Sequence, residues 1–369
     1  MRLRLPELVL AAVAVSAALG CSAARETVRA TGALFSSPRP VTKAKSPVAA
    51  DARLAVVWVG HSTVLIQLED KVILTDPVFT STVGSLRKRL IEPGIDPKDL
   101  PRIDAALVSQ LGADHLSLGS LEMIAPKVRA LLLPAGGAAY ITDGFSFPSY
   151  ELRTWQVWEK DGVRVTAVPV DRGGGRYAID QAWLPREAST AYVIEYKGVT
   201  VYFSGATAYN QRVFVETGQR FPNIDLAILP IAPIEPRDEM HRRNLDPAQA
   251  IQAFVDLGAA RMVPIHYDTF VTSTDQPGDA LRELAKAEKS VDLGRTRIVV
   301  PLAVGERRVF VKAGESQELT VPVEQRLPPL APPSSEAPPA PQQEQKIPDD
   351  DSFESVSYTH LTLPTICSV

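Results

Sequence analysis

An acidic residue and a histidine stand side by side at Asp114-His115, directly after a stretch, 103–108, that has the pattern of a buried strand. Carboxylate and imidazole groups are common ligands of catalytic zinc, and a turn after such a strand is where a hydrolytic metal site often begins. The residues just before the pair, Gln110 and Gly112, are poor metal ligands. The stretch 108–118 is therefore a metal site, the remains of one, or an ordinary loop.

The strands that would position this pair are predicted to occur in two similar sets. Hairpins are predicted at 64–74 and 192–203, where β-rich runs are interrupted by Glu-Asp and Lys-Gly turns. A single apolar strand follows each hairpin, at 105–108 in the first half and 226–229 in the second. The chain therefore has two sheet halves of similar design.

Helices are predicted between and after these strands. Asp246-Pro247 marks a helix start, because a capping residue precedes proline at the first helical position, and a second helix is predicted over 279–287. Two sheet halves with helices outside them predict an α/β fold, a four-layer α/β/β/α sandwich, over residues 53–315.

The composition and net charge of the chain limit the class of protein to which it can belong. Of the 369 residues, 45% are hydrophobic and 22% are charged, which is typical of a folded globular protein. A net charge of −4 does not favour nucleic-acid binding, so we expect no nucleic-acid partner. The sequence has 2 cysteines, too few for a disulfide framework, so the apolar core must hold the fold.

The N-terminal residues have the pattern of an export signal. Two arginines precede an apolar run at 8–19, which has the length of a signal-peptide core and is too short to cross a bilayer. The run ends at Cys21 in a sequence that resembles a bacterial lipoprotein signal. This predicts a signal peptide at 1–20, lipid on Cys21 as the membrane anchor, and a tether at 21–52. The protein would then lie in the bacterial cell envelope, on the outer membrane facing the periplasm; the alternative is a plain secretory signal with an incidental cysteine.

The C-terminal part is predicted to lie outside the fold. Proline recurs with Ser, Glu and Gln over 316–355, a composition that cannot bury enough apolar surface and predicts a disordered tail. Residues 356–369 resemble a translated sequencing-adapter read-through, which removes His360 and Cys367 from the candidate site.

Five blocks of sequence resemble a known family in their order and spacing. The family is the metallo-β-lactamase superfamily, and within it the branch of N-acylphosphatidylethanolamine-hydrolysing phospholipase D and the ascorbate-phosphate lactonases. The resemblance covers nearly all of 53–315, and it implies the four-layer sandwich and a hydrolytic site for two metal ions. The blocks are 56–79, 92–109, 201–210, 221–240 and 246–270.

The metal ligands that the resemblance implies are only partly present. Family members follow the third strand with Ser-His-x-His-x-Asp-His, and later carry Pro-x-His-x-x-Thr-Phe. When these motifs and two others are aligned with this sequence, they imply seven positions for metal ligands. Three positions keep a ligand, and these are Asp114, His115 and His266. Four have lost theirs, at Gln110, Gly112, Arg172 and Ala206, and a further family histidine falls on Asn244.

The surviving ligands imply a site for one metal ion. Two histidines and one carboxylate can bind Zn²⁺ or Fe²⁺ with open positions, and such an ion lowers the pKa of a water molecule and so supplies a nucleophile. His61, in a Gly-His-x-Thr turn, and Asp76 are expected to support the ligands rather than to bind the metal. The alternatives are that Asp114 only caps a turn and that His115 and His266 are buried core residues.

Arg172 stands where the family has a metal-binding histidine. A permanent cation there would repel a metal ion and could pair with an anionic small molecule or a phospholipid head group through its planar fork. Alternatively, the three glycines at 173–175 let the side chain swing into solvent. His241 lies close to Asn244 in the sequence and could stand in as a ligand, although nothing in the sequence fixes its direction.

Three hypotheses about function result. The first is an exported lipoprotein whose degenerate metallo-β-lactamase-like site is non-catalytic and binds a ligand in the old cleft, a pseudoenzyme without a cofactor. The second is a single-metal hydrolase of phosphodiesters or lactones that uses zinc or iron on Asp114, His115 and His266. The third is a structural or interaction protein of the envelope. No catalytic residue is assigned beyond these ligands.

Overall fold

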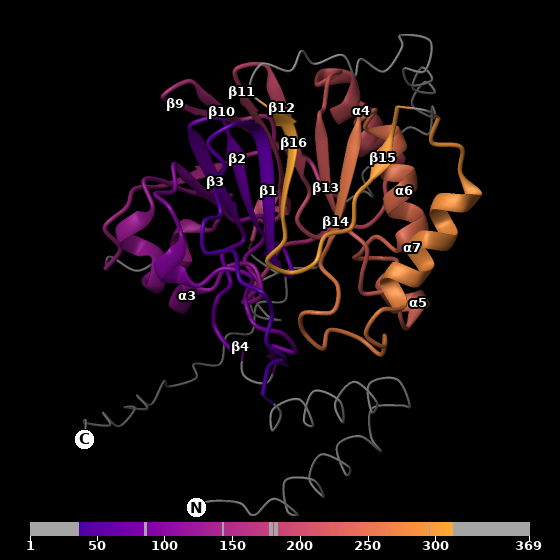
Figure 1. Cartoon of the computed structure of the whole chain (residues 1–369), viewed down its shortest axis with the longest axis horizontal. Coiled ribbons are helices and arrows are strands. Elements are labelled where there is room, and N and C mark those ends of the chain that lie inside the picture. Colours follow the sequence, from indigo (N-terminus) through magenta and orange to yellow (C-terminus); the bar gives the residue numbers. More distant parts are fainter. Residues whose placement is uncertain are drawn as a thin grey trace, which may run out of the picture. The chain divides into compact units, whose positions relative to one another are not determined.

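Two seven-stranded sheets form the framework of the described chain (Figure 1). The computed structural model describes residues 37–84, 87–141, 144–176, 180, 184–294 and 296–312. In spatial order, the first sheet consists of β16 (Arg307–Lys312), β1 (Ala52–Gly60), β2 (Thr63–Leu68), β3 (Lys71–Thr75), β6 (Ala105–Leu107), β7 (Leu131–Pro134) and β8 (Ser149–Leu152). The second consists of β15 (Ile298–Val299), β14 (Arg261–Ile265), β13 (Leu226–Pro230), β12 (Val199–Phe203), β11 (Ala191–Tyr196), β10 (Val163–Val168) and β9 (Val157–Lys160).

The remaining elements are short or lie outside the two sheets. The helices are α3 (Leu118–Ile124), α4 (Gln211–Arg220), α5 (Arg237–Met240), α6 (Pro247–Asp256) and α7 (Asp279–Ser290). A small ribbon pairs β4 (Thr82–Val83) with β5 (Arg87–Lys88). Single 3₁₀ turns occur at η1 (Pro97–Asp99), η2 (Ala125–Lys127), η3 (Ala138–Tyr140) and η5 (Arg186–Ala188).

The two sheets repeat one design, as the sequence predicted. In the first sheet β1, β2 and β3 pair antiparallel, and β6, β7 and β8 then add in parallel. In the second sheet β9 to β12 pair antiparallel, and β13, β14 and β15 add in parallel. Both predicted hairpins are confirmed. The second turns at Lys197-Gly198, where both residues have positive φ, 46° and 78°, as a two-residue hairpin turn requires.

The sheets are covered on both faces, which gives four layers. Along β1, Val56 and Trp58 pack in the core shared with the second sheet, whereas Val57 and Val59 pack in a separate cluster with residues of α3. Side chains alternate between the faces of a strand, so these two clusters lie on opposite faces of the first sheet. Residues of α4, α6 and α7 join the core against the second sheet. The predicted α/β/β/α sandwich is confirmed, and Figure 1 shows α3 on one side and α4, α6 and α7 on the other.

The helix predicted from Asp246-Pro247 is α6, and its start is fully capped. The Asp246 carboxylate accepts a hydrogen bond from the backbone N–H of Gln249 at 2.9 Å, and the Gln249 side chain accepts one from the N–H of Asp246 at 3.1 Å. This capping box satisfies two backbone donors that the helix itself leaves unpaired. α6 begins at the predicted residue, and α7 covers the other predicted helix.

The packed part of the chain begins before residue 53, which corrects the predicted tether of 21–52. Gln67 exchanges two hydrogen bonds with the backbone of Ala49, at 2.8 and 2.7 Å. Lys43 bonds Asp96 at 2.7 Å, and Ala44 donates to Gly94. These residues find partners on β2 and on the loop near residue 95, so they pack onto the domain. The predicted signal peptide, Cys21, the tail and residues 356–369 lie outside the described residues.

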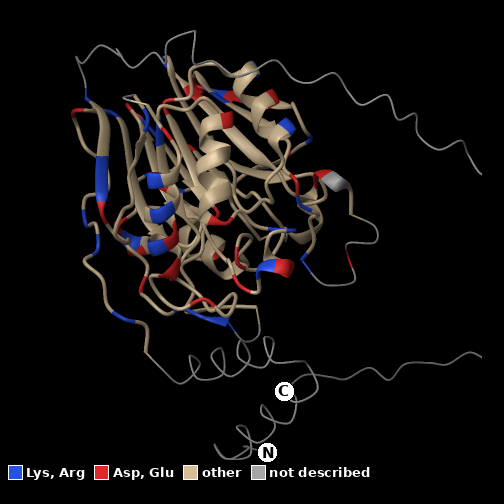
Figure 2. Cartoon of the chain, turned by 90° about the vertical axis from the view of Figure 1, so that its right-hand side faces the viewer, with Lys and Arg blue, Asp and Glu red and all other residues tan. Residues whose placement is uncertain are grey.

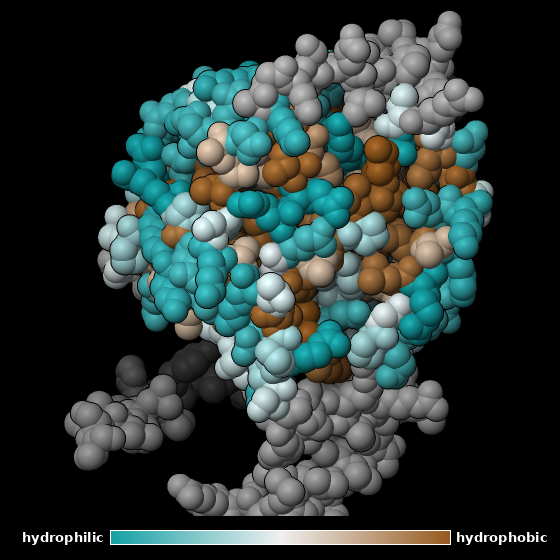
Figure 3. Space-filling model, in the orientation of Figure 1, coloured by the Kyte–Doolittle hydropathy of each residue, from teal (hydrophilic) through white to brown (hydrophobic). Residues whose placement is uncertain are grey.

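The surface is mixed in charge and in hydropathy. In Figure 2, segments with Lys and Arg are interspersed with segments carrying Asp and Glu. On the face drawn in Figure 3, apolar side chains are scattered between hydrophilic ones. Within the described ranges, no helix has the length and apolar character that a membrane span needs.

Candidate metal centre

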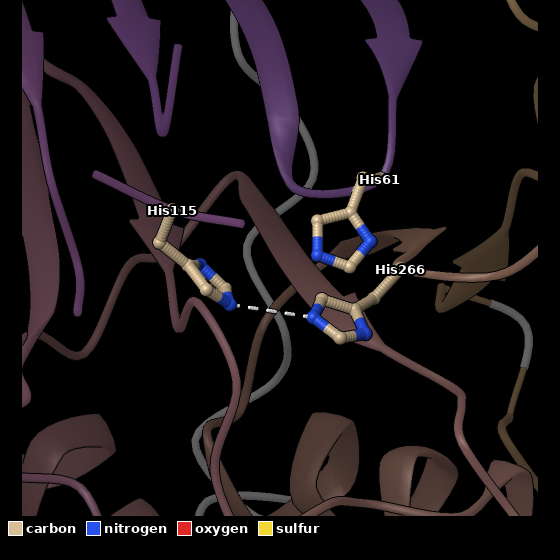
Figure 4. Close-up of side chains that lie close together, drawn as sticks. All are labelled: His61, His115 and His266. Carbon is tan, nitrogen blue, oxygen red and sulfur yellow. Dashed lines mark hydrogen bonds between the residues drawn. The ribbon is translucent and has the colours of Figure 1, made fainter. Parts of the chain in front are cut away.

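Three histidines from both sheets meet at one end of the sandwich (Figure 4). His61 lies in the turn between β1 and β2, His115 lies between β6 and α3, and His266 directly follows β14. One ring nitrogen of each lies within 4.8 Å of the other two, and all three residues are buried, with exposed fractions of 1%, 1% and 5%. We call these residues the histidine cluster. The close approach of strand ends from the two sheets creates it.

His115 is held in place by a buried carboxylate. Its Nδ1 lies 2.7 Å from Oδ2 of Asp76, which is fully buried. Asp76 also accepts hydrogen bonds from the backbone N–H and the hydroxyl of Ser109, both at 2.7 Å. Because a carboxylate only accepts, Nδ1 of His115 carries the hydrogen, and Nε2 faces the cluster. A histidine whose outer nitrogen donates to a carboxylate is the usual arrangement of a metal ligand.

His266 is fixed in the same way by a carbonyl group. Its Nδ1 donates to the backbone oxygen of Ala232 at 3.0 Å, so that Nε2 faces His115. The two Nε2 atoms are 3.5 Å apart (Figure 4). Zinc–nitrogen bonds of about 2.0–2.1 Å in a tetrahedral site place two ligand nitrogens roughly 3.4 Å apart. The observed separation therefore fits two ligands of one metal ion.

His61 completes the cluster and has an unsatisfied nitrogen. Its backbone is tied down, because its N–H donates to the hydroxyl of Thr269 at 2.8 Å and its carbonyl accepts from the N–H of His266 at 2.9 Å. Its buried Nε2 has no hydrogen-bond partner among the described residues. A buried polar atom without a partner costs about 1–3 kcal/mol, so this nitrogen is better explained as a ligand than as a core residue. The donor set therefore fits a metal ion.

The backbone is strained where it presents these residues. His61, Asp76 and His266 have φ angles of 53°, 34° and 74°. Residues other than glycine rarely adopt this left-handed region, and such strain gathers at functional sites. The surrounding hydrogen bonds hold these three residues in backbone conformations of high free energy, which supports a functional role for this end of the sandwich.

Two histidines of the cluster, His61 and His266, are in the neutral form that binds a metal ion. Burial lowers the pKa of His61 and His266, so both imidazoles stay neutral with a lone pair for a metal. Burial also opposes the charged form of His115, but the carboxylates of Asp76 and Asp114 outweigh it and raise the pKa of His115. For Asp114, burial is outweighed by His115 and His61, and its pKa lies well below the ordinary value.

Asp114 lies beside the cluster at its solvent side. Its Oδ2 is 3.6 Å from Nε2 of His61 and 4.0 Å from Nη1 of Arg87, and its side chain is 22% exposed. Of the ligands predicted from the sequence, the structure thus brings His115 and His266 together and leaves Asp114 at the edge. His61, which we expected to support the site, takes the third inner position. Asp76 lies behind His115.

Arg89 is a residue near the site that sequence reasoning missed. The residue is 1% exposed, and its guanidinium lies 5.1 Å from the ring centre of Phe270 and donates to the backbone oxygen of Val78. Burial lowers the pKa of Arg89 to about 10. A Cβ atom on Gly60, whose φ is +122°, would lie 3.2 Å from this guanidinium. Arg89 therefore packs behind the turn that presents His61, and only the folded structure reveals this.

Three of the positions predicted from the sequence to have lost a ligand, Gln110, Gly112 and Ala206, lie close to one another or to Asp114. The Gln110 amide donates a hydrogen bond to the backbone oxygen of Ala206. A Cβ on Gly112 would lie 2.8 Å from the Asp114 carboxylate. The neighbouring Gly205 has a φ of +62°, and a Cβ there would overlap the hydroxyl of Ser109 at 2.1 Å, so this turn requires glycine. The Gln110 side chain is therefore bonded to the turn that carries Ala206.

Arg172 and Asn244 are in contact with each other, whereas the side chain of His241 bonds elsewhere. Arg172 donates from Nη1 to Oδ1 of Asn244 at 2.8 Å and to the carbonyl of Arg243 at 2.9 Å, so the side chain is anchored. His241 is exposed at the end of α5, with Nδ1 2.7 Å from the carbonyl of Arg237. It is not part of the cluster of three found among the described residues.

Comparison with known proteins places the chain in a family. The sequence model of the protein family described as Beta-lactamase superfamily domain matches residues 71–267. An uncharacterized protein of Mycobacterium tuberculosis is 30% identical over 266 residues, which is 68% of each chain. N-acyl-phosphatidylethanolamine-hydrolyzing phospholipase D 1 of Caenorhabditis elegans is 27% identical over 65% of this chain and 72% of its own.

Solved structures agree on the fold. A metallo hydrolase from Ignicoccus hospitalis, Igni18, superposes with a TM-score of 0.52 at 18% identity, covering 69% of this chain and 97% of that one. An isothiocyanate hydrolase from Delia radicum gut bacteria gives a TM-score of 0.54 at 17% identity, covering 70% and 99%. The family match and the four-layer sandwich show that the chain belongs to the metallo-β-lactamase superfamily of metal-dependent hydrolases, and the histidine cluster could hold a metal ion.

Proposed function

We propose that the chain is a hydrolase that works with a single metal ion held by His61, His115 and His266. The observation that carries this proposal is the convergence of three buried ring nitrogens within 4.8 Å of one another. Positions that would serve a second ion hold Gln110 and Ala206, which bond each other. Three imidazoles with an open fourth position are a known catalytic zinc set.

The surrounding residues have distinct tasks in this proposal. A bound zinc ion lowers the pKa of water toward neutrality and polarises a substrate oxygen. Asp76 orients His115 and fixes which nitrogen faces the cluster. Asp114 stays ionised beside His61 and accepts hydrogen bonds at the solvent side, either from water or from substrate. The backbone bond from His266 to His61 keeps the two loops together.

The substrate class proposed is a phosphodiester or a lactone. Similarity to the phospholipase D of Caenorhabditis elegans supports the first. Removing one preorganised electrostatic element commonly costs on the order of 10²–10³ in rate. Because the proposed site has no second ion and no bridging carboxylate, we expect hydrolysis slower than that of a two-metal relative by at least this factor.

A second candidate function is binding without catalysis. It is favoured by the anchoring of Arg172 on Asn244, which places a permanent cation where the resemblance implies a metal ligand. In that case the old cleft binds an anion and the histidine cluster is a remnant.

Metal analysis separates the two candidates. We expect untagged protein of residues 22–355 to contain about one equivalent of zinc or iron, and to hydrolyse bis-nitrophenyl phosphate in a chelator-sensitive and metal-restored manner. Two equivalents of metal would contradict the single-ion site. Protein that binds none, and shows no activity after zinc addition, would leave only the binding function.

We also propose that the protein is anchored in the bacterial cell envelope through lipid on Cys21, which lies outside the described residues. Cys21→Ala should move the protein from the membrane fraction to the soluble fraction, because the acyl chains are the proposed anchor. Immunoblots of separated fractions measure this, and unchanged fractionation would contradict the lipid anchor.

A further inference from the structure

We propose that Arg172 binds a doubly charged phosphate group of the substrate beside the histidine cluster. As a statement about the substrate this rests on the proposed function, whereas the anion site itself does not depend on a bound metal. Arg172 would then hold a terminal phosphate of the substrate, apart from the bond that is hydrolysed.

The first support is the way the guanidinium is anchored. Both of its hydrogen bonds leave from Nη1, to Oδ1 of Asn244 at 2.8 Å and to the carbonyl of Arg243 at 2.9 Å. Asn244 is itself buried, with 5% exposed. Among the described residues, Nε and Nη2 of Arg172 have no acceptor. The Nε and Nη2 edge of a guanidinium group can bind phosphate or carboxylate with two parallel hydrogen bonds.

The second support is the position of the backbone that carries Arg172. The preceding residue, Asp171, pairs with Ala208, and its N–H donates to the hydroxyl of Thr207 at 3.1 Å. That turn begins at Gly205, which packs against Ser109, the residue that bonds Asp76 behind His115. These contacts tie the backbone before Arg172 to the residues behind His115, and the charge of Arg172 acts on both His115 and His266.

The third support is an uncompensated positive charge. No carboxylate lies within salt-bridge distance of Arg172 in the part of the chain that the structure describes. Burial lowers the pKa of Arg172, and Asp114 opposes that shift while Arg243 and Arg87 add to it. Arg243 is a second guanidinium close enough to act on Arg172, and among the described residues neither of the two has a carboxylate within salt-bridge distance.

This balance of charge selects the kind of anion. One carboxylate ligand would leave part of the positive charge of Arg172 and Arg243 uncompensated. A phosphate monoester carries close to two negative charges and three acceptor oxygens, so it can bind the Arg172 guanidinium and still interact with that of Arg243. We therefore infer a terminal phosphate rather than a carboxylate.

The test uses inorganic phosphate and chelator-treated protein of residues 22–355, so that no metal contributes to binding. Isothermal titration calorimetry should show phosphate binding that weakens about 10- to 100-fold in Arg172→Gln, the range expected for lost charge-assisted hydrogen bonds. Arg172→Lys, which keeps the charge and loses the fork, should weaken it less. Arg164→Gln is the matched control, because Arg164 is an exposed arginine on β10.

The thermal melting of each variant shows whether it is folded. Asn244→Ala provides an independent route, because it keeps Arg172 and removes one anchor, and it should also weaken phosphate binding. Phosphate binding that is undetectable in the parent, or equal in Arg172→Gln and the parent, would overturn the proposal. Acetate that binds as tightly as phosphate would overturn the choice of a phosphate.

Metal content is measured on the same proteins and separates the two proposals. Arg172→Gln should retain the parent's metal content, since Arg172 is not a ligand. Phosphate binding that depends on Arg172 in a protein without any metal affinity would support the anion site and reject the metal-dependent function. One bound metal with Arg172-independent phosphate binding would reject the anion site alone.

Discussion

His61→Ala is expected to release the metal ion, although from the sequence we expected His61 to support the ligands rather than to bind the metal. Loss of an outer-shell partner costs about 10–100-fold in metal affinity, and we expect a larger loss on removing one of three inner nitrogens. Activity should fall by on the order of 10²–10³ or more. The turn should survive, because His61 bonds Thr269, Trp58 and His266 through its backbone.

Zinc titration in competition with a chelating dye measures this effect. His241→Ala is the matched control, because His241 is exposed and lies outside the cluster, and it should bind zinc as the parent does. Asp114→Asn should retain one zinc ion in our assignment and lose affinity if the carboxylate is a ligand. A His61→Ala protein with the parent's zinc affinity would return the site to Asp114, His115 and His266.

Asp76→Ala is expected to have the largest effect on stability. It removes the acceptor of three hydrogen bonds, from the N–H and hydroxyl of Ser109 and from His115, each 2.7 Å long. Breaking a buried charged pair by removing one partner costs about 3–5 kcal/mol, because the remaining charge stays buried without its counter-charge. Urea unfolding of the metal-free protein should therefore show a decrease of this size in the free energy of unfolding.

Two variants make the result specific. Glu283→Ala removes an exposed carboxylate on α7, 48% accessible and 2.7 Å from Lys286, and should change stability by less than about 1 kcal/mol. Asp76→Asn keeps the shape but places an NH₂ group against one of its former donors, and should lower zinc affinity by about 10–100-fold. An Asp76→Ala protein within about 1 kcal/mol of the parent would show that the network is not a stabilising element.

The sequence by itself determined the elements whose formation depends on near neighbours. The Lys197-Gly198 turn, the capped start of α6 and the alternating strands were all predictable, because their hydrogen bonds and φ angles involve residues a few positions apart. The family resemblance added His266, which no local pattern identifies as a ligand. Asp114-His115 was found from its position after a strand, and His115 does lie in the cluster.

Only the tertiary structure decided which side chains face one another. His61 and His266 belong to different sheets, and a backbone hydrogen bond between their loops brings their rings to 3.9 Å between centroids. Their direction depends on left-handed backbone angles that long-range contacts maintain, so spacing along the chain could not predict it. Arg172 is likewise fixed by Asn244, far away in sequence. Side-chain direction at the ends of packed sheets is set by the packing of the two sheets, which the linear pattern does not encode.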